Sequence, residues 1–169
     1  MLRTLWTDYI VPILRRPPHF QVAALCYRCR GQSIEILLVT SLETRQWLLP
    51  KGWPKSGLDA GGTALEEAWE EAGIKPCGPK PRPIGEYRYE KRMGGGVPAP
   101  TNVKVYAIEI EKLLDSYPEA GRRERRWLSP AEAASLATEP GLKHFLETVE
   151  PALRRLVQGS GRTEESDNL

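Results

Sequence analysis

The sequence predicts an α+β fold in which a mixed β-sheet lies between helices. Short runs of apolar and β-branched residues, typical of strands, recur through the first two thirds of the chain. One helical pattern interrupts these runs and further helical patterns close the chain, which differs from the regular alternation of a doubly wound sheet. The 15 glycines and 15 prolines favour many short loops over a helical bundle.

The first half of the chain is expected to hold a hairpin, a loop and one helix. The expected strands and helix lie, in order, at 21–29, 34–40, 47–49 and 63–72. Arg30-Gly31-Gln32 has the composition of a β-hairpin turn between the first two strands. Residues 51–62 contain four glycines and a proline, which predicts a loop before the helix. Gly73 is expected to end that helix as its C-cap.

The second half is expected to add strands and then helices. Further strands are expected at 84–92, 103–110 and 125–128. Four prolines in 75–83 predict a linker, because proline cannot donate to a strand ladder. Residues 93–100 read as a hairpin tip. Ser129-Pro130-Ala131-Glu132 is a capping box that starts a helix, and apolar residues at helical spacing between 142 and 156 predict a last helix kinked at Pro151.

Composition places the chain among single-domain proteins. With 169 residues and a formal net charge of +2, it lacks the excess of basic residues that binds a nucleic-acid polymer. We divide it into an N-terminal segment (1–18), a central domain (19–158) and a polar C-terminal tail (159–169). Three cysteines are a sparse and odd set, which favours a reducing cytoplasm, and no apolar run approaches the roughly 20 residues of a membrane span. The apolar N-terminal segment leaves a homodimer contact open.

The predicted helix 63–72 carries an unusual concentration of acid. Glu66, Glu67, Glu70 and Glu71 fill four of six positions, and the helix has no Lys or Arg. Like charges at i,i+4 and carboxylates in the last turn together cost on the order of 1–3 kcal/mol. Such a local cost is expected at functional sites. Glu67, Glu70 and Glu71 share one face and suit Mg²⁺ or Mn²⁺; the alternative is a solvated acidic face.

The residues around this helix extend the pattern, and here the sequence resembles the Nudix hydrolases. Their signature is G-x5-E-x7-R-E-U-x-E-E-x-G-U, where U is a bulky aliphatic residue. Its positions are filled here by Gly52, Glu67, Glu70, Glu71, Gly73 and Ile74. Residues 45–52 and 121–127 are also similar to the branch that hydrolyses diphosphoinositol polyphosphates and diadenosine polyphosphates.

Two positions depart from the signature. Leu58 stands where the first glutamate is expected, and Glu66 stands where the arginine is expected. In the family that glutamate and arginine are thought to pair and brace the loop against the helix. The resemblance therefore implies a lost brace with an intact set of catalytic glutamates.

The resemblance implies a Nudix α/β/α sandwich and a Nudix pyrophosphohydrolase acting on a diphosphate linkage. It implies Glu67, Glu70 and Glu71 as the catalytic and metal-binding residues, with the carbonyl of Gly52 or Lys51 as a further ligand. The group that activates water stays open among these glutamates and the loop residues Glu119 and Glu124. A non-catalytic Nudix-like module that binds a nucleotide or phosphorylated ligand is the alternative, and the departures at 58 and 66 are its support.

Basic residues outside the helix are the candidate substrate contacts. They are Lys51, Lys55, Arg45, Arg88, Arg92, Lys104, Arg122 and Arg123. Only Trp53 and Tyr87 are candidates for stacking on a base, and Trp69 is expected in the core. A site with many basic donors and few stacking surfaces favours recognition of the number of phosphates over recognition of the base. We therefore expect a phosphate-dense substrate, a diphosphoinositol polyphosphate or a dinucleoside polyphosphate, over ADP-ribose or a single dNTP.

Overall fold

The computed structural model describes residues 19–76, 80–92, 96 and 98–164, in which eight strands form one mixed sheet. The strands are β1 (His19–Arg30), β2 (Ser33–Thr40), β3 (Trp47–Leu48), β4 (Lys51–Gly52), β5 (Ile74–Pro76), β6 (Arg82–Arg92), β7 (Pro98–Leu113) and β8 (Arg125–Leu128). The main path runs β3-β2-β1-β7-β5, while β4 pairs with β1, β6 with β7 and β8 with β2. β1 and β7 are parallel, and the other pairs are antiparallel.

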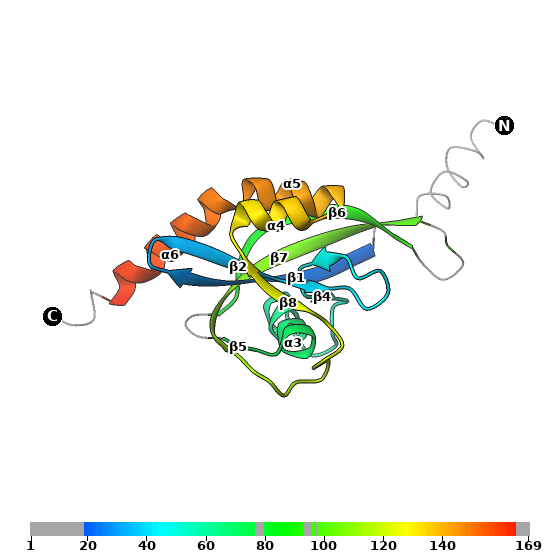
Figure 1. Cartoon of the computed structure of the whole chain (residues 1–169), viewed down its shortest axis with the longest axis horizontal. Coiled ribbons are helices and arrows are strands. Elements are labelled where there is room, and N and C mark those ends of the chain that lie inside the picture. The colour runs from blue at the N-terminus through cyan, green and yellow to red at the C-terminus, as the bar shows by residue number, and fades with distance from the viewer. Residues whose placement is uncertain (1–18, 77–79, 93–95, 97, 165–169) are drawn as a thin grey trace, which may run out of the picture.

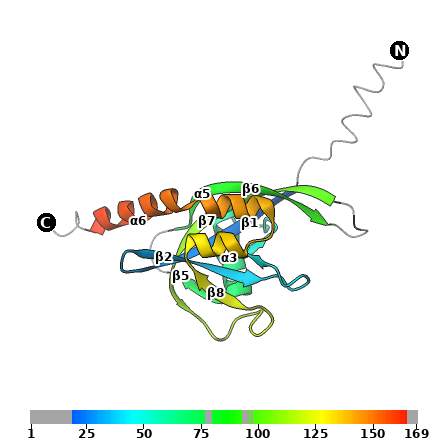
Figure 2. The same cartoon turned by 45° about the horizontal axis from the view of Figure 1, so that its top comes forward.

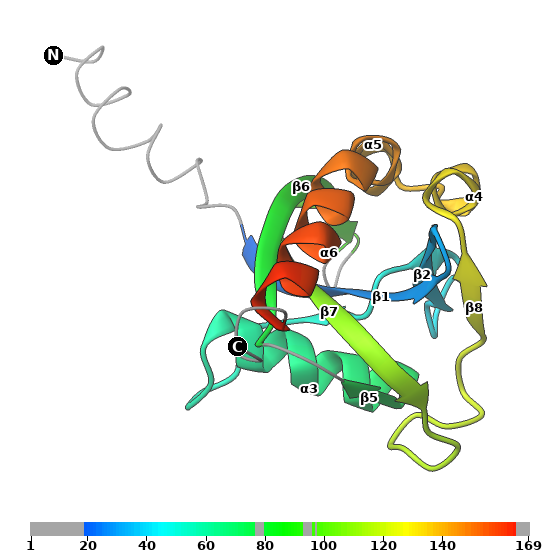
Figure 3. The same cartoon turned by 90° about the vertical axis from the view of Figure 1, so that its left-hand side faces the viewer.

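Helices cover both faces of this sheet. Helix α3 (Ala60–Ala72) lies against one face, and α4 (Pro130–Leu136), α5 (Pro140–Thr148) and α6 (Glu150–Glu164) lie on the other. Figure 3 shows the three layers, and Figures 1 and 2 show α6 extending beyond the sheet. The α+β fold with a mixed sheet between helices, predicted from the sequence, is confirmed.

The long strand β1 runs through the middle of the molecule and is buried on both faces. Val22, Ala24 and Cys26 pack in the core beneath α3. Ala23, Leu25 and Tyr27 pack in the other core, with residues of α4, α5 and α6. This double coverage is why the strand reads as a continuous apolar run with no polar alternation.

Helix α3 packs closely on the sheet through small residues. Ala64, Ala68 and Ala72 recur every fourth position, and each is fully buried. Trp69 lies on the outer side with 44% of its surface exposed, so its predicted place in the core is wrong. The helix begins at Ala60, earlier than predicted, because the Asp59 side chain caps it by accepting a hydrogen bond from the Gly62 amide at 2.6 Å. Gly73 ends it as predicted, with a left-handed φ of 62°.

Several predicted boundaries shift in the structure. The proline-rich stretch 75–83 was expected to be a linker, yet β5 ends within it and β6 begins within it. The single kinked helix is two helices, α5 and α6, and α6 continues to Glu164 into the expected tail. The N-terminal segment 1–18 and part of the predicted tip at 93–100 lie outside the described residues.

Candidate active site

The site is built where β4 meets the acidic face of α3. Gly52 pairs with Val22 of β1, which sets its backbone directly beneath the helix. A Cβ atom at position 52 would overlap the carboxylate of Glu67, so the contact requires glycine. Glu67 and Glu71 are buried, with 7% and 8% of their surface exposed. Two carboxylates are thus held inside the protein beside the loop that follows β4.

Lys55, in that loop, supplies the positive charge that the helix lacks. Its Nζ lies 3.1 Å from Glu67 Oε1, 2.9 Å from Glu70 Oε2 and 3.4 Å from Glu66 Oε1. Burial alone lowers the pKa of Lys55, but hydrogen bonds to Glu70 and Glu67 outweigh it and hold the pKa above its ordinary value. The structure therefore groups Glu66, rather than Glu71, with Glu67 and Glu70.

Glu71 is held by a different cation, Arg123. Arg123 Nη2 donates to Glu71 Oε1 at 2.8 Å, Nη1 donates to the carbonyl of Thr40 at 3.0 Å, and Nε donates to Glu119. The other carboxylate oxygen of Glu71 accepts from the Lys51 amide at 3.2 Å. Burial raises the pKa of Glu71 to about 7, against the opposing effect of Arg123 and Lys51. Arg123 was expected to contact substrate, and all of these bonds instead turn it inward.

The segment after β7 clamps the end of α3. The Glu119 amide donates to the carbonyl of Glu70 at 3.1 Å, and Arg125 Nη1 donates to the carbonyl of Ala72 at 3.0 Å. A guanidinium at the carboxyl end of a helix offsets the unfavourable dipole that the acidic last turn experiences. Sequence reasoning missed this clamp, because its residues are about 50 positions from the helix.

Aromatic and basic side chains gather near the start of β1. Lys51 Nζ lies 5.3 Å from the Tyr89 ring centre, and Lys91 Nζ lies 4.8 Å from that of Trp53. The Trp53 ring also meets His19 edge-on, with ring centres 5.6 Å apart. Burial lowers the pKa of the Lys51 ammonium, although the nearby negative charge of Glu71 raises it in part. Trp53 was a predicted stacking candidate; Tyr89 and His19 were missed because β6 and β1 contribute them from distant positions.

The remaining predicted substrate contacts are distributed around this region. Arg45 donates to the carbonyl of Arg122 at 2.9 Å and pairs with Glu124 at 2.7 Å, so it ties one loop to another. Arg88 and Arg92 have exposed side chains on β6, Lys104 is exposed on β7, and Arg122 is exposed before β8. Tyr87, the second stacking candidate, is buried against Phe145, with ring centres 5.9 Å apart.

The acidic face carries the chemistry of a cation site. Carboxylates are the ligands that hard divalent cations prefer, and two of them already converge on one ammonium group. Within the described ranges, no three His, Cys, Asp or Glu side chains stand in metal-binding geometry; Glu67 and Glu70 pair with Lys55, and Glu71 pairs with Arg123. The donor set fits a divalent cation that takes the place of the Lys55 ammonium.

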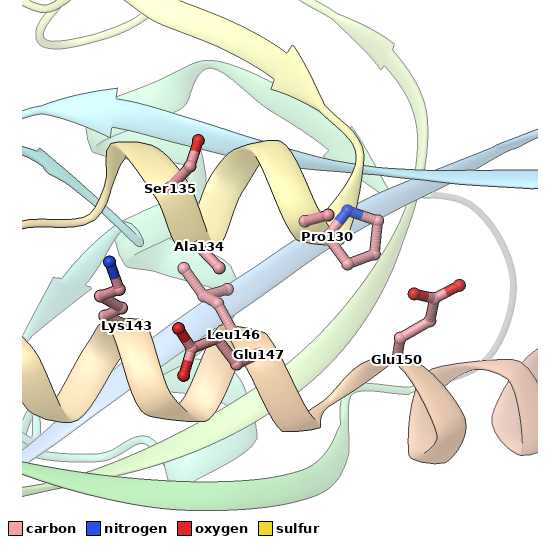
Figure 4. Close-up of a pocket in the computed structure, with 8 residues that line it drawn as sticks. Pro130, Ala134, Ser135, Lys143, Leu146, Glu147 and Glu150 are labelled. Carbon is pink, nitrogen blue, oxygen red and sulfur yellow. The ribbon is translucent and has the colours of Figure 1, made fainter.

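Hollows elsewhere on the surface do not belong to this site. One of about 310 Å³ lies between α4 and α5, across the sheet from α3, and its lining mixes apolar residues with Lys143, Glu147 and Glu150 (Figure 4). Another of about 320 Å³ lies between the β1–β2 turn and α6. In the part of the chain that the structure describes, no helix is long and apolar enough to cross a membrane.

The fold and the acidic helix match a known protein family. The family model of the NUDIX domain matches residues 17–149, and the chain belongs to the Nudix family. Members of this family generally use divalent metal ions. The structure places four residues of the signature at this site. Gly52 lies at the start of the loop, and Glu67, Glu70 and Glu71 lie along the acidic face of α3.

Individual relatives agree with this assignment. The chain is 30% identical to Nudix hydrolase 12, mitochondrial, of Arabidopsis thaliana over 80% of this chain and 72% of the relative. It is 29% identical to human diphosphoinositol polyphosphate phosphohydrolase 2 over 67% of this chain and 59% of the relative. Across these and further Arabidopsis Nudix hydrolases the chain spans between 54% and 72% of their length.

A solved structure shows the same fold. The Ap4A hydrolase of C. elegans superposes with a TM-score of 0.60 at 18% identity, covering 83% of this chain and 98% of that one. The predicted Nudix α/β/α sandwich is confirmed.

Proposed function

We propose that this chain is a metal-dependent pyrophosphohydrolase that cleaves a diphosphate linkage in a phosphate-rich substrate. The observation that carries the proposal is the convergence of Glu67 and Glu70 on one cation position, Lys55 Nζ, at 3.1 and 2.9 Å. Hydrolase relatives and a fold shared with an Ap4A hydrolase support the same reaction class.

Glu67 and Glu70 would hold the cation, Mg²⁺ or Mn²⁺, beside Gly52, and Glu71 would join them as the third ligand by exchanging Arg123 for the cation. When bound, the cation neutralises charge on the phosphate oxygens and lowers the pKa of water. In the reaction a water oxygen attacks one phosphorus, the bond from that phosphorus to the bridging oxygen breaks, and the proton passes to a carboxylate. The base stays open among the three helix glutamates, Glu119 and Glu124, because each of these carboxylates pairs with a lysine or an arginine in the structure.

The substrate class follows from the basic side chains near the site. Lys51 and Lys91 lie over the rings of Tyr89 and Trp53, and Arg88, Arg92 and Lys104 are exposed on the neighbouring strands. Ammonium and guanidinium groups spread over the three strands β4, β6 and β7 suit several phosphates more than one. We therefore favour a diphosphoinositol polyphosphate or a dinucleoside polyphosphate.

Hydrolysis with Mg²⁺, followed by chromatographic separation of the phosphorylated products, tests this proposal. Ap4A, diphosphoinositol pentakisphosphate, ADP-ribose and dATP form the panel, with Glu70→Gln as the inactive control. We expect kcat/KM to be highest for one of the first two and to fall steeply as salt rises, since several phosphate contacts are screened together. The highest kcat/KM on ADP-ribose would refute the substrate class. Binding without any hydrolysis of the panel would favour the non-catalytic module instead.

The remaining features stay predictions. They are a cytoplasmic location, a homodimer built through the N-terminal segment, and the absence of nucleic-acid polymers and membranes among the partners. The names of the relatives differ in compartment: Nudix hydrolase 12 of Arabidopsis is named as mitochondrial, and Nudix hydrolase 4 is not.

A further inference from the structure

The three carboxylates around Lys55 belong to two groups. Glu67 and Glu70 are proposed cation ligands, with Nζ at 3.1 and 2.9 Å. Glu66 is not, and its distance of 3.4 Å from Nζ is the longest of the three. Glu66 is also the most exposed of the three, with 38% of its side chain accessible against 33% for Glu70 and 9% for Glu67. Lys55 therefore touches both the cation ligands and one carboxylate outside them.

The backbone of Lys55 is fixed while its side chain can pivot. Its amide donates to Thr63 Oγ1 at 3.4 Å, and its carbonyl accepts from the Leu58 amide at 3.2 Å, so the loop is tied to the first turns of α3. The lysine stem is a flexible chain of four carbons. Nζ can thus move between neighbouring carboxylates on α3 without any movement of the loop.

A divalent cation and the Lys55 ammonium compete for the same oxygens. Two positive charges within about 4 Å of each other repel strongly in a partly buried site. The ammonium must therefore leave Glu67 and Glu70 when a cation binds there. Glu66 lies about 100° around the helix from Glu67 and already contacts Nζ, so it offers the shortest move to a new partner.

We propose that Glu66 is a positioning residue of the metal site, which receives Lys55 when a divalent cation takes Glu67 and Glu70. Glu66 thereby raises metal affinity through Lys55, without contacting the metal. This inference rests on the proposed function, because it takes the acidic face of α3 as the metal site. It also gives a role to the residue that stands in place of the signature arginine.

Mn²⁺ binding to the full chain, measured by calorimetry and by electron paramagnetic resonance, tests the inference without any substrate. The variants are Glu66→Gln, Lys55→Met and the two combined. We expect Lys55→Met to bind Mn²⁺ about three- to fivefold more tightly and Glu66→Gln to bind it about three- to fivefold more weakly, the upper end of the range for partly exposed ion pairs. In the Lys55→Met background, Glu66→Gln should change the affinity by less than about twofold.

A matched control and a second measurement complete the test. Lys75 lies on β5, and its Nζ is 2.9 Å from Glu111 Oε2 on β7. Lys75→Met removes this lysine and should leave Mn²⁺ affinity unchanged. In EDTA, Lys55→Met should melt below the wild-type protein, because three carboxylates lose their counter-charge, and the difference should close at saturating Mn²⁺.

The outcomes separate this inference from the proposed function. Glu66→Gln could lower Mn²⁺ affinity equally in the wild-type and Lys55→Met backgrounds. That result would mean that Glu66 acts only through its own charge and would overturn the inference. Unchanged affinity in Lys55→Met would overturn it as well. A wild-type protein that binds no Mn²⁺ would overturn the proposed function itself.

Discussion

Replacing Arg123 with methionine should destabilise the protein more than any other loss of a single surface-loop cation. The Arg123 side chain is 8% exposed and its partner Glu71 is 11% exposed, so the ion pair is buried. Methionine keeps most of the volume of the stem but leaves the Glu71 carboxylate without its guanidinium. It also removes the donors to Glu119 and to the carbonyl of Thr40.

The magnitude follows from the burial of the pair. Removing one partner of a buried ion pair costs about 3–5 kcal/mol. In a domain of this size each kcal/mol lowers the melting temperature by about 2–4 °C, so a fall of about 6–20 °C is expected. The loss should be smaller at pH 6 than at pH 8. Burial raises the pKa of Glu71 to about 7, and removal of Arg123 raises it further, so the carboxyl takes up a proton at pH 6.

Thermal and urea denaturation in EDTA measure this change. The matched control is Arg126→Met, which removes an exposed arginine of β8 whose guanidinium lies 5.7 Å from the Trp47 ring centre. The double variant Arg123→Met with Glu71→Leu should recover much of the loss, because an apolar pair can replace a buried ion pair at little cost. A loss below about 1 kcal/mol for Arg123→Met, the value of an exposed pair, would refute the buried-pair reasoning.

Kinetics then distinguish the observed position of Arg123 from the predicted substrate contact. If Arg123 acts by holding Glu71, Arg123→Lys should lower kcat with KM for Ap4A unchanged. A rise in KM with kcat unchanged would instead indicate that Arg123 binds substrate, as the sequence suggested.

Three further predictions concern the acidic face. Millimolar Mg²⁺ should raise the melting temperature above its value in EDTA. At a hundredfold excess of Mg²⁺ over Kd, the free energy of unfolding should increase by about 2.7 kcal/mol. An unchanged melting temperature would count against the metal site. Glu70→Gln should lower kcat by about two orders of magnitude or more with an unchanged circular dichroism spectrum; full activity would exclude Glu70 from the machinery. Gly52→Ala should displace the Glu67 carboxylate and lower metal affinity in calorimetry, whereas Gly61→Ala, whose added Cβ would meet only ordinary contacts from 3.6 Å outward, should leave metal affinity unchanged.

The sequence was most informative where local chemistry decides the structure. The hairpin through Gly31, the capping box at Ser129 and the C-cap at Gly73 all formed as predicted, because each depends on residues close in sequence. Trp69 was misplaced because its size suggested the core, while the fully buried row of α3 against the sheet consists of Ala64, Ala68 and Ala72. The pairing of Arg123 with Glu71 could not be read from spacing, since 52 positions separate the two residues.

The two departures from the signature have one physical explanation in the structure. The expected pair places an acid in the loop, at position 58, and a base on the helix, at position 66. In this chain Lys55 is a base in the loop and Glu66 is an acid on the helix, 3.4 Å apart, so the brace persists with its charges exchanged. The exchange places a positive charge beside Glu67 and Glu70, where it neutralises the acidic face before any cation arrives. On the proposed function, metal binding at this face would be a replacement of one cation by another.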